Sequence, residues 1–99
     1  MSKQDRFREY TRSVWRQSCE AYERWPADRR DTVWAAVDAL VVELRRCAGE
    51  DELYARYWEV GDWPAEVLRR HLRSDPGQEA LLELEEAAFW LRYRELAGD

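Results

Sequence analysis

The run from Val33 to Ala48 constrains the fold of this chain more than any other part of its sequence. Its apolar side chains recur at steps of three and four, the spacing of one helix face: Val33, Val37, Leu40, Leu44 and Cys47. Further apolar residues widen that face, and few charged residues interrupt the run. A helix that is apolar on most sides is usually surrounded by other helices. We therefore predict that the helix containing this run, residues 26–48, is central in the fold.

Proline-containing segments mark the starts of several helices. The pattern W-P-A-acid occurs at residues 25–28 and 63–66, and a proline variant occurs at 75–79. Proline favours the first helical turn, where its missing N–H has no partner to lose, and an acidic residue there suits the positive end of the helix dipole. No segment alternates apolar and polar residues as a strand does. These marks predict one all-α domain over residues 1–99, a compact bundle with helices at about 3–24, 26–48, 50–60, 64–73 and 76–97.

Charge and composition exclude several classes of partner. The 99 residues have a net charge of −5, which argues against general nucleic-acid binding. The charge is uneven, because residues 1–30 have eight basic and five acidic side chains (+3), whereas residues 31–99 have eight and sixteen (−8). No run approaches the ~20 apolar residues of a membrane span, and the first residues do not resemble a signal peptide. We therefore expect a cytoplasmic protein that does not bind membranes.

The sequence does not assemble a catalytic or metal site. His71 is the only histidine, and Glu66, five positions away, does not share a helix face with it as a partner. The glutamates of the last helix lack the Glu-x-x-His spacing of helical metal proteins. No nucleophile motif or phosphate-binding glycine loop is present. We therefore predict a protein that is not an enzyme and that needs no metal or cofactor.

The excess of aromatic residues points to a contact surface. Six Trp and five Tyr are more than one small core easily buries, and Trp and Tyr are enriched among the anchors of protein interfaces. Our preferred hypothesis is a small adaptor, inhibitor or regulatory subunit that binds another protein or forms a homodimer. Its predicted contact residues combine exposed rings with an acidic helix face: Trp15, Tyr22, Trp90, Glu83 and Glu86.

A first alternative assigns the binding function to nucleic acid. Arg8, Arg12 and Arg16 recur at steps of four on the first predicted helix. Such a stripe can contact phosphates, although Glu9 and Glu20 are spaced to pair with these arginines. This pattern is consistent with a small helical subunit that contacts nucleic acid inside a larger complex.

A second alternative is a sensor of small ligands. Tyr54, Tyr57, Trp58 and Trp63 are close in sequence and are expected near the junction of two short helices. Aromatic rings gathered in one place form walls that suit planar or cationic ligands. The sequence therefore also predicts an aromatic pocket at these residues.

Overall fold

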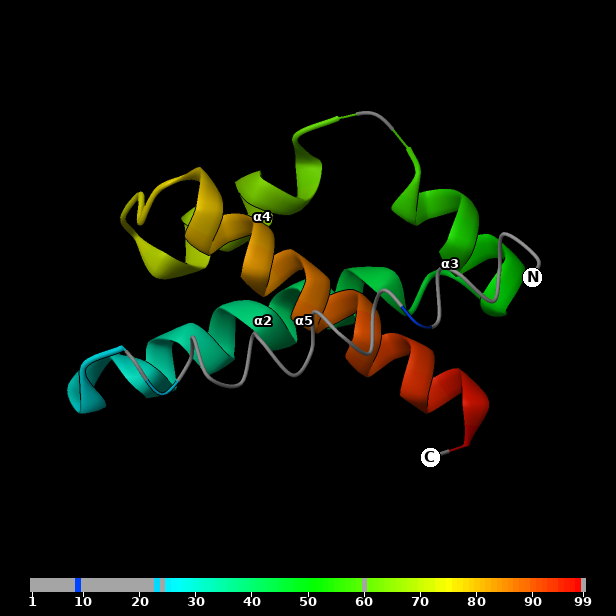
Figure 1. Cartoon of the computed structure of the whole chain (residues 1–99), viewed down its shortest axis with the longest axis horizontal. Coiled ribbons are helices and arrows are strands. Elements are labelled where there is room, and N and C mark those ends of the chain that lie inside the picture. The colour runs from blue at the N-terminus through cyan, green and yellow to red at the C-terminus, as the bar shows by residue number, and fades with distance from the viewer. Residues whose placement is uncertain (1–8, 10–22, 24, 60, 99) are drawn as a thin grey trace.

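The structure, a computed structural model, describes Glu9, Glu23, residues 25–59 and residues 61–98 (Figure 1). The elements in this part of the chain are the 3-10 helix η1 (Ala27–Arg29) and the α-helices α2 (Arg30–Leu44), α3 (Glu50–Tyr57), α4 (Trp63–Leu72) and α5 (Gln78–Ala97). No strand occurs among the described residues, so the predicted all-α class is confirmed for them. The predicted helix at 3–24 lies outside the described residues, and the count of five helices stays a prediction.

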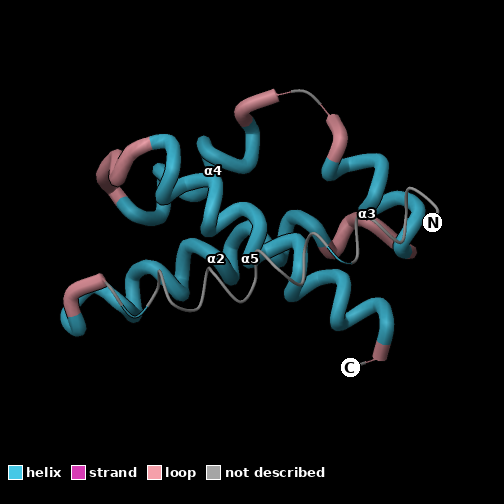
Figure 2. The backbone as a smooth tube through the Cα atoms, in the orientation of Figure 1, coloured by secondary structure: helices cyan, strands magenta, loops and turns pink. Residues whose placement is uncertain are grey.

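The helices pack around one buried apolar cluster. α2 packs against α4 and α5, α4 also packs against α5, and α3 packs against α5 (Figure 2). α2 contributes to this cluster the apolar face that its sequence spacing predicted. The residues of that face are all buried: Val33, Val37, Leu40 and Leu44. Leucines from the other helices complete the cluster: Leu53, Leu68, Leu72, Leu81 and Leu84. Burial of such side chains is the main force that holds a small bundle together.

α2 is shorter than the predicted 26–48 helix at both ends. Pro26 precedes η1, and the α-helix proper begins at Arg30. At the other end the backbone tightens, because the N–H groups of Arg46 and Cys47 bond to carbonyl groups only three residues earlier. Such tighter turns are common where a helix ends, since they satisfy carbonyl groups that have no partner in the next turn.

Arg92 of α5 connects the end of α2 to α5. Its Nε donates to the carbonyl oxygen of Leu44 at 3.2 Å, and its Nη2 donates to that of Cys47 at 2.6 Å. The side chain of Arg92 is only 13% exposed, and Glu95 lies 3.4 Å from its Nη1. A cation at a helix C-terminus also interacts favourably with the helix dipole. The guanidinium therefore gives the Leu44 carbonyl a second donor besides the Cys47 N–H, and it supplies a donor to the carbonyl of Cys47, just beyond the end of α2.

We predict that Arg92→Met lowers the free energy of unfolding by about 2–3 kcal/mol, because charged hydrogen bonds to two carbonyl groups are lost in a mostly buried place. Urea unfolding followed by tryptophan fluorescence measures this loss. Arg45→Met is the matched control, since Arg45 pairs with the same Glu95 at 2.8 Å but is 54% exposed. Its unfolding midpoint should stay close to that of the wild type. Equal losses in the two variants would contradict the role given to Arg92.

Candidate functional site

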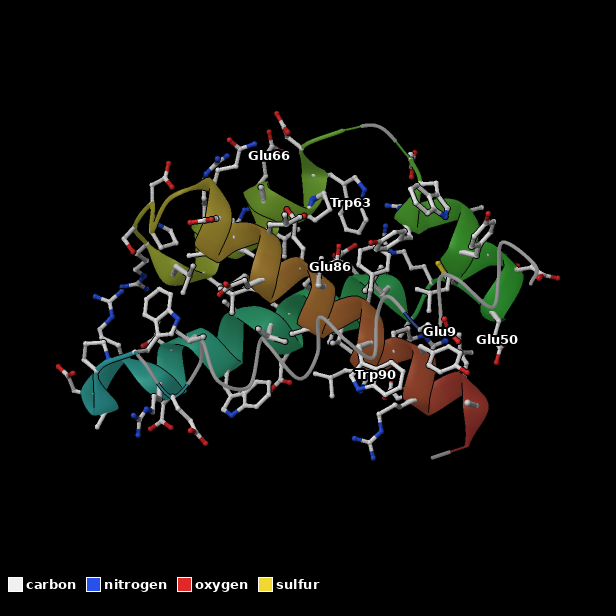
Figure 3. All side chains as sticks on the ribbon, in the orientation of Figure 1. Glu9, Glu50, Trp63, Glu66, Glu86 and Trp90 are labelled. Atoms are coloured by element: carbon white, nitrogen blue, oxygen red, sulfur yellow. The ribbon has the colours of Figure 1, made fainter. Side chains whose placement is uncertain are left out.

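A cavity of about 230 Å³ opens among α3, the start of α4 and α5. We call it the α3–α5 pocket. Its lining consists of aromatic, acidic and apolar side chains with a single arginine: Arg56, Tyr57, Trp58, Glu59, Gly61, Trp63, Pro64, Leu82, Glu85, Glu86 and Phe89. Figure 3 shows Trp63 at the start of α4 and Glu86 on α5. The two labelled residues lie on the same side of α5. The pocket therefore joins residues from three helices that are separated in the sequence.

Aromatic rings form most of the wall. Tyr57 is in edge-to-face contact with Trp58 at 5.0 Å between ring centroids and with Phe89 of α5 at 5.3 Å. Tyr54 also contacts Trp58, at 6.3 Å, one turn earlier on α3. The spacing of three and four residues places these rings on adjoining faces of α3, and the fully buried Leu53 fixes that helix on the core. In each edge-to-face contact the edge of one ring meets one face of its neighbour.

Arg56 lies across one of these rings. Its guanidinium carbon is 4.2 Å from the ring centroid of Trp63, within the range of a cation–π interaction. Its Nε also lies 3.2 Å from a carboxylate oxygen of Glu59. A positive charge of the chain itself therefore occupies one aromatic face of the pocket.

Glu86 is a buried acid at the base of the pocket. Only 5% of its surface is exposed, and its Oε1 accepts a hydrogen bond of 2.8 Å from the Tyr57 hydroxyl. Its buried Oε2 has no hydrogen-bond partner in the part of the chain that the structure describes. Burial raises the pKa of Glu86 to about 7, and the negative charge of Glu85 adds to that rise, whereas the Tyr57 hydrogen bond opposes it. Glu86 therefore changes its charge close to neutral pH.

Glu85 adds a second perturbed carboxyl group to the same wall. Burial raises its pKa, the nearby Asp62 raises it further, and Arg69 acts in the opposite direction. Two neighbouring acids that both resist ionisation are costly for stability, and such groups cluster at functional sites. The buried Glu86, its unpaired Oε2 and the surrounding cavity make the pocket the strongest candidate site among the described residues.

Exposed apolar side chains line the same pocket. Trp58 is 62% exposed and Leu82 is 49% exposed, and both belong to the lining. The remaining large apolar residue that is strongly exposed in the described chain is Val42, on α2, which does not line the pocket. Exposed apolar groups gathered at one place, unlike scattered ones, mark sites of interaction.

The structure brings together most of the predicted aromatic pocket. Tyr57, Trp58 and Trp63 line the cavity, whereas Tyr54 contacts Trp58 without lining it. The sequence analysis did not place Phe89, Glu85 or Arg56 at this site. Phe89, Glu85 and Glu86 come from α5. No signal in a single sequence shows which part of α5 meets α3.

Two residues that were predicted to lie on an exposed contact surface, Trp90 and Glu86, are buried in the structure. Trp90 is buried, with 7% of its surface exposed, and stacks on Tyr93 at 5.3 Å. Glu86 is buried in the pocket wall, and Glu83 is partly buried. α5 packs against α2, α3 and α4, so a pattern that assigns α5 one apolar and one solvent-exposed side does not describe its burial. Trp90 belongs to the buried apolar cluster, as do Leu81 and Leu84 of the same helix.

The other predicted contact residues are outside the described chain. They are the rings Trp15 and Tyr22 and the arginines Arg8, Arg12 and Arg16. Among the residues that the structure does describe, no three His, Cys, Asp or Glu side chains are grouped so that they could hold a metal ion. In the same residues, no helix has the length and apolar character needed to cross a bilayer.

Comparisons with known proteins give no relative from which to transfer a function. No protein-family model, no curated protein and no solved structure matches this chain. The candidate function therefore depends on the chemistry of the α3–α5 pocket.

Proposed function

We propose that this chain is a non-catalytic binding module that holds another protein at the α3–α5 pocket. The observation that supports this proposal most strongly is the exposure of Trp58 and Leu82 beside one cavity. Tryptophan is enriched among the anchors that contribute most of the energy of protein interfaces, and the exposed Leu82 adds apolar surface to the same pocket mouth. The partner therefore covers these two side chains and inserts a group between them.

The lining favours binding over catalysis. Its ionisable groups are three carboxylates, one tyrosine hydroxyl and one guanidinium, namely Glu59, Glu85, Glu86, Tyr57 and Arg56. A hydrolytic or transfer reaction needs a nucleophile, a base beside it and a group that orients the base. These side chains are instead suited to charge and shape recognition.

The proposal retains three expectations from the sequence. The protein functions in the cytoplasm as a small adaptor, inhibitor or regulatory subunit. The fifth helix at about 3–24 and the central position of the helix predicted at 26–48 stay predictions, because almost all of residues 1–24 lie outside the described residues. The proposed contact surface has the pocket mouth in place of Trp90, because Trp90 is buried.

Peptides selected for binding from a random displayed library test the proposal. We expect Trp58→Ala and Leu82→Ala each to weaken the selected peptides about tenfold or more, since both side chains anchor the partner. Val42→Ala is the matched control, because Val42 is 56% exposed but lies outside the pocket. It should change affinity by less than about twofold. Fluorescence polarisation with labelled peptides gives these affinities.

Two outcomes bear on the identity of the partner. Peptides that bind all three variants as they bind the wild type would show that the pocket mouth is not the binding surface. Light scattering of the free protein tests a homodimer, which Trp58→Ala should dissociate if a second copy is the natural partner.

A further inference from the structure

We infer that the α3–α5 pocket takes a methylated ammonium cation, an inference that rests on the proposed binding function and names the chemical group inserted. Three independent features of the described residues point to a cation: the ring faces, the excess of carboxyl groups, and an arginine already placed on one ring. The size and apolar character of the cavity point to an organic cation.

The rings supply the first argument. Tyr57, Trp58, Trp63 and Phe89 all line the cavity, and the face of an aromatic ring carries partial negative charge. Cations are attracted to such faces, most strongly to those of tryptophan, and aromatic walls are the usual way in which proteins recognise methylated ammonium groups. Metal cations keep their hydration shell tightly, so apolar walls favour organic cations.

The carboxyl groups supply the second argument. Glu59, Glu85 and Glu86 line the pocket against the single positive charge of Arg56. Glu86 is 5% exposed, and its Oε2 has no hydrogen-bond partner among the described residues. A buried carboxylate with one unsatisfied oxygen is costly. A bound cation would stabilise its ionised form.

Arg56 supplies the third argument. Its guanidinium lies 4.2 Å from the centroid of Trp63, so the geometry of this wall already accommodates a positive group. A carboxylate oxygen of Glu59 lies 3.2 Å from Arg56 Nε. The positive charge is therefore held by one aromatic ring, Trp63, and one acid, Glu59. The remaining carboxyl groups, Glu85 and Glu86, have no such arginine within the lining.

The volume fits the head of such a cation. The cavity volume of about 230 Å³ is many times the ~15 Å³ that a cavity needs to hold one water molecule. A trimethylated or tetramethylated ammonium head has about five heavy atoms, so the cavity holds it with space left over.

Two probes at pH 8 test the inference and separate its two sources. Tetramethylammonium chloride represents a free cation, and a short peptide with one trimethylated lysine represents a side chain of a partner. Tryptophan fluorescence should show saturable binding of one or both, roughly tenfold tighter than the uncharged analogue tert-butanol or a peptide with the uncharged carbon isostere. Tighter binding of the peptide than of the free cation would assign the cation to a partner protein.

Variants make the test specific to the pocket. We expect Trp63→Ala and Glu86→Gln each to weaken binding by roughly fivefold or more, whereas Val42→Ala should leave it unchanged. Arg56→Met should tighten it, because the competing guanidinium is removed, and a merely structural role of the pocket would not produce that gain. Equal affinity for charged and uncharged probes would overturn the inference. If the selected peptides still depend on Trp58 and Leu82 in that case, the proposed function stands alone.

Discussion

Glu86→Gln should stabilise the protein relative to the wild type by about 3 kcal/mol more at pH 8 than at pH 4. The pKa of Glu86 is about 7 in the folded chain against an ordinary value of 4.5, and each pKa unit corresponds to about 1.4 kcal/mol. Between these two values the folded chain holds a proton that the unfolded chain has released. Raising the pH through this window therefore lowers the free energy of unfolding.

The substitution isolates this effect from those of the other acids. Glutamine retains an oxygen that can accept the hydrogen bond from Tyr57, and it has no charge to release. Urea unfolding gives the free energy of unfolding of both proteins at pH 4 and at pH 8. The gap between variant and wild type at pH 8, minus the gap at pH 4, is the quantity predicted. A gap between wild type and variant that does not change with pH would show that Glu86 ionises normally in the folded chain.

Leu53→Ala should lower the free energy of unfolding by about 3 kcal/mol, the middle of the range for removing a buried leucine side chain. Leu53 is fully buried and is the one buried residue of α3. Its loss leaves a cavity beneath that helix, so the contacts of Tyr57 with Glu86 and Phe89 should weaken together. The variant should therefore lose ligand binding as well as stability.

Leu82→Ala is the matched control for stability, since it makes the same chemical change at a side chain that is 49% exposed. It should lose less than about 1 kcal/mol. Thermal and urea unfolding of the two variants measure the difference. Comparable losses would mean that Leu53 does not anchor α3 on the core.

The period of apolar residues predicted the buried face of α2 because that signal is local. Val33, Val37, Leu40 and Leu44 lie on one side of a helix whatever packs against them, and all are buried. The limits of α2 were less predictable, because they depend on hydrogen bonds such as those of Arg92, which comes from a helix 48 residues later. Contacts that distant leave no periodic signal in one sequence.

The candidate site was predictable on α3 and not on α5. Tyr57, Trp58 and Trp63 are close along the chain, so their clustering follows from local spacing. Glu86 and Trp90 both lie on the side of α5 whose pattern indicates solvent exposure. Several helices pack on α5, and a single sequence contains no information about which of its sides they meet.

The position of Arg56 over Trp63 has a consequence for selectivity. A guanidinium tethered to α3 has a high effective concentration at that ring, as any intramolecular group does. A cation that binds at this ring must therefore compete with the Arg56 guanidinium, which has the same charge. Ions that the pocket attracts only weakly do not bind there. Only a group that gains more from the ring faces and the carboxylates than this arginine does can displace it.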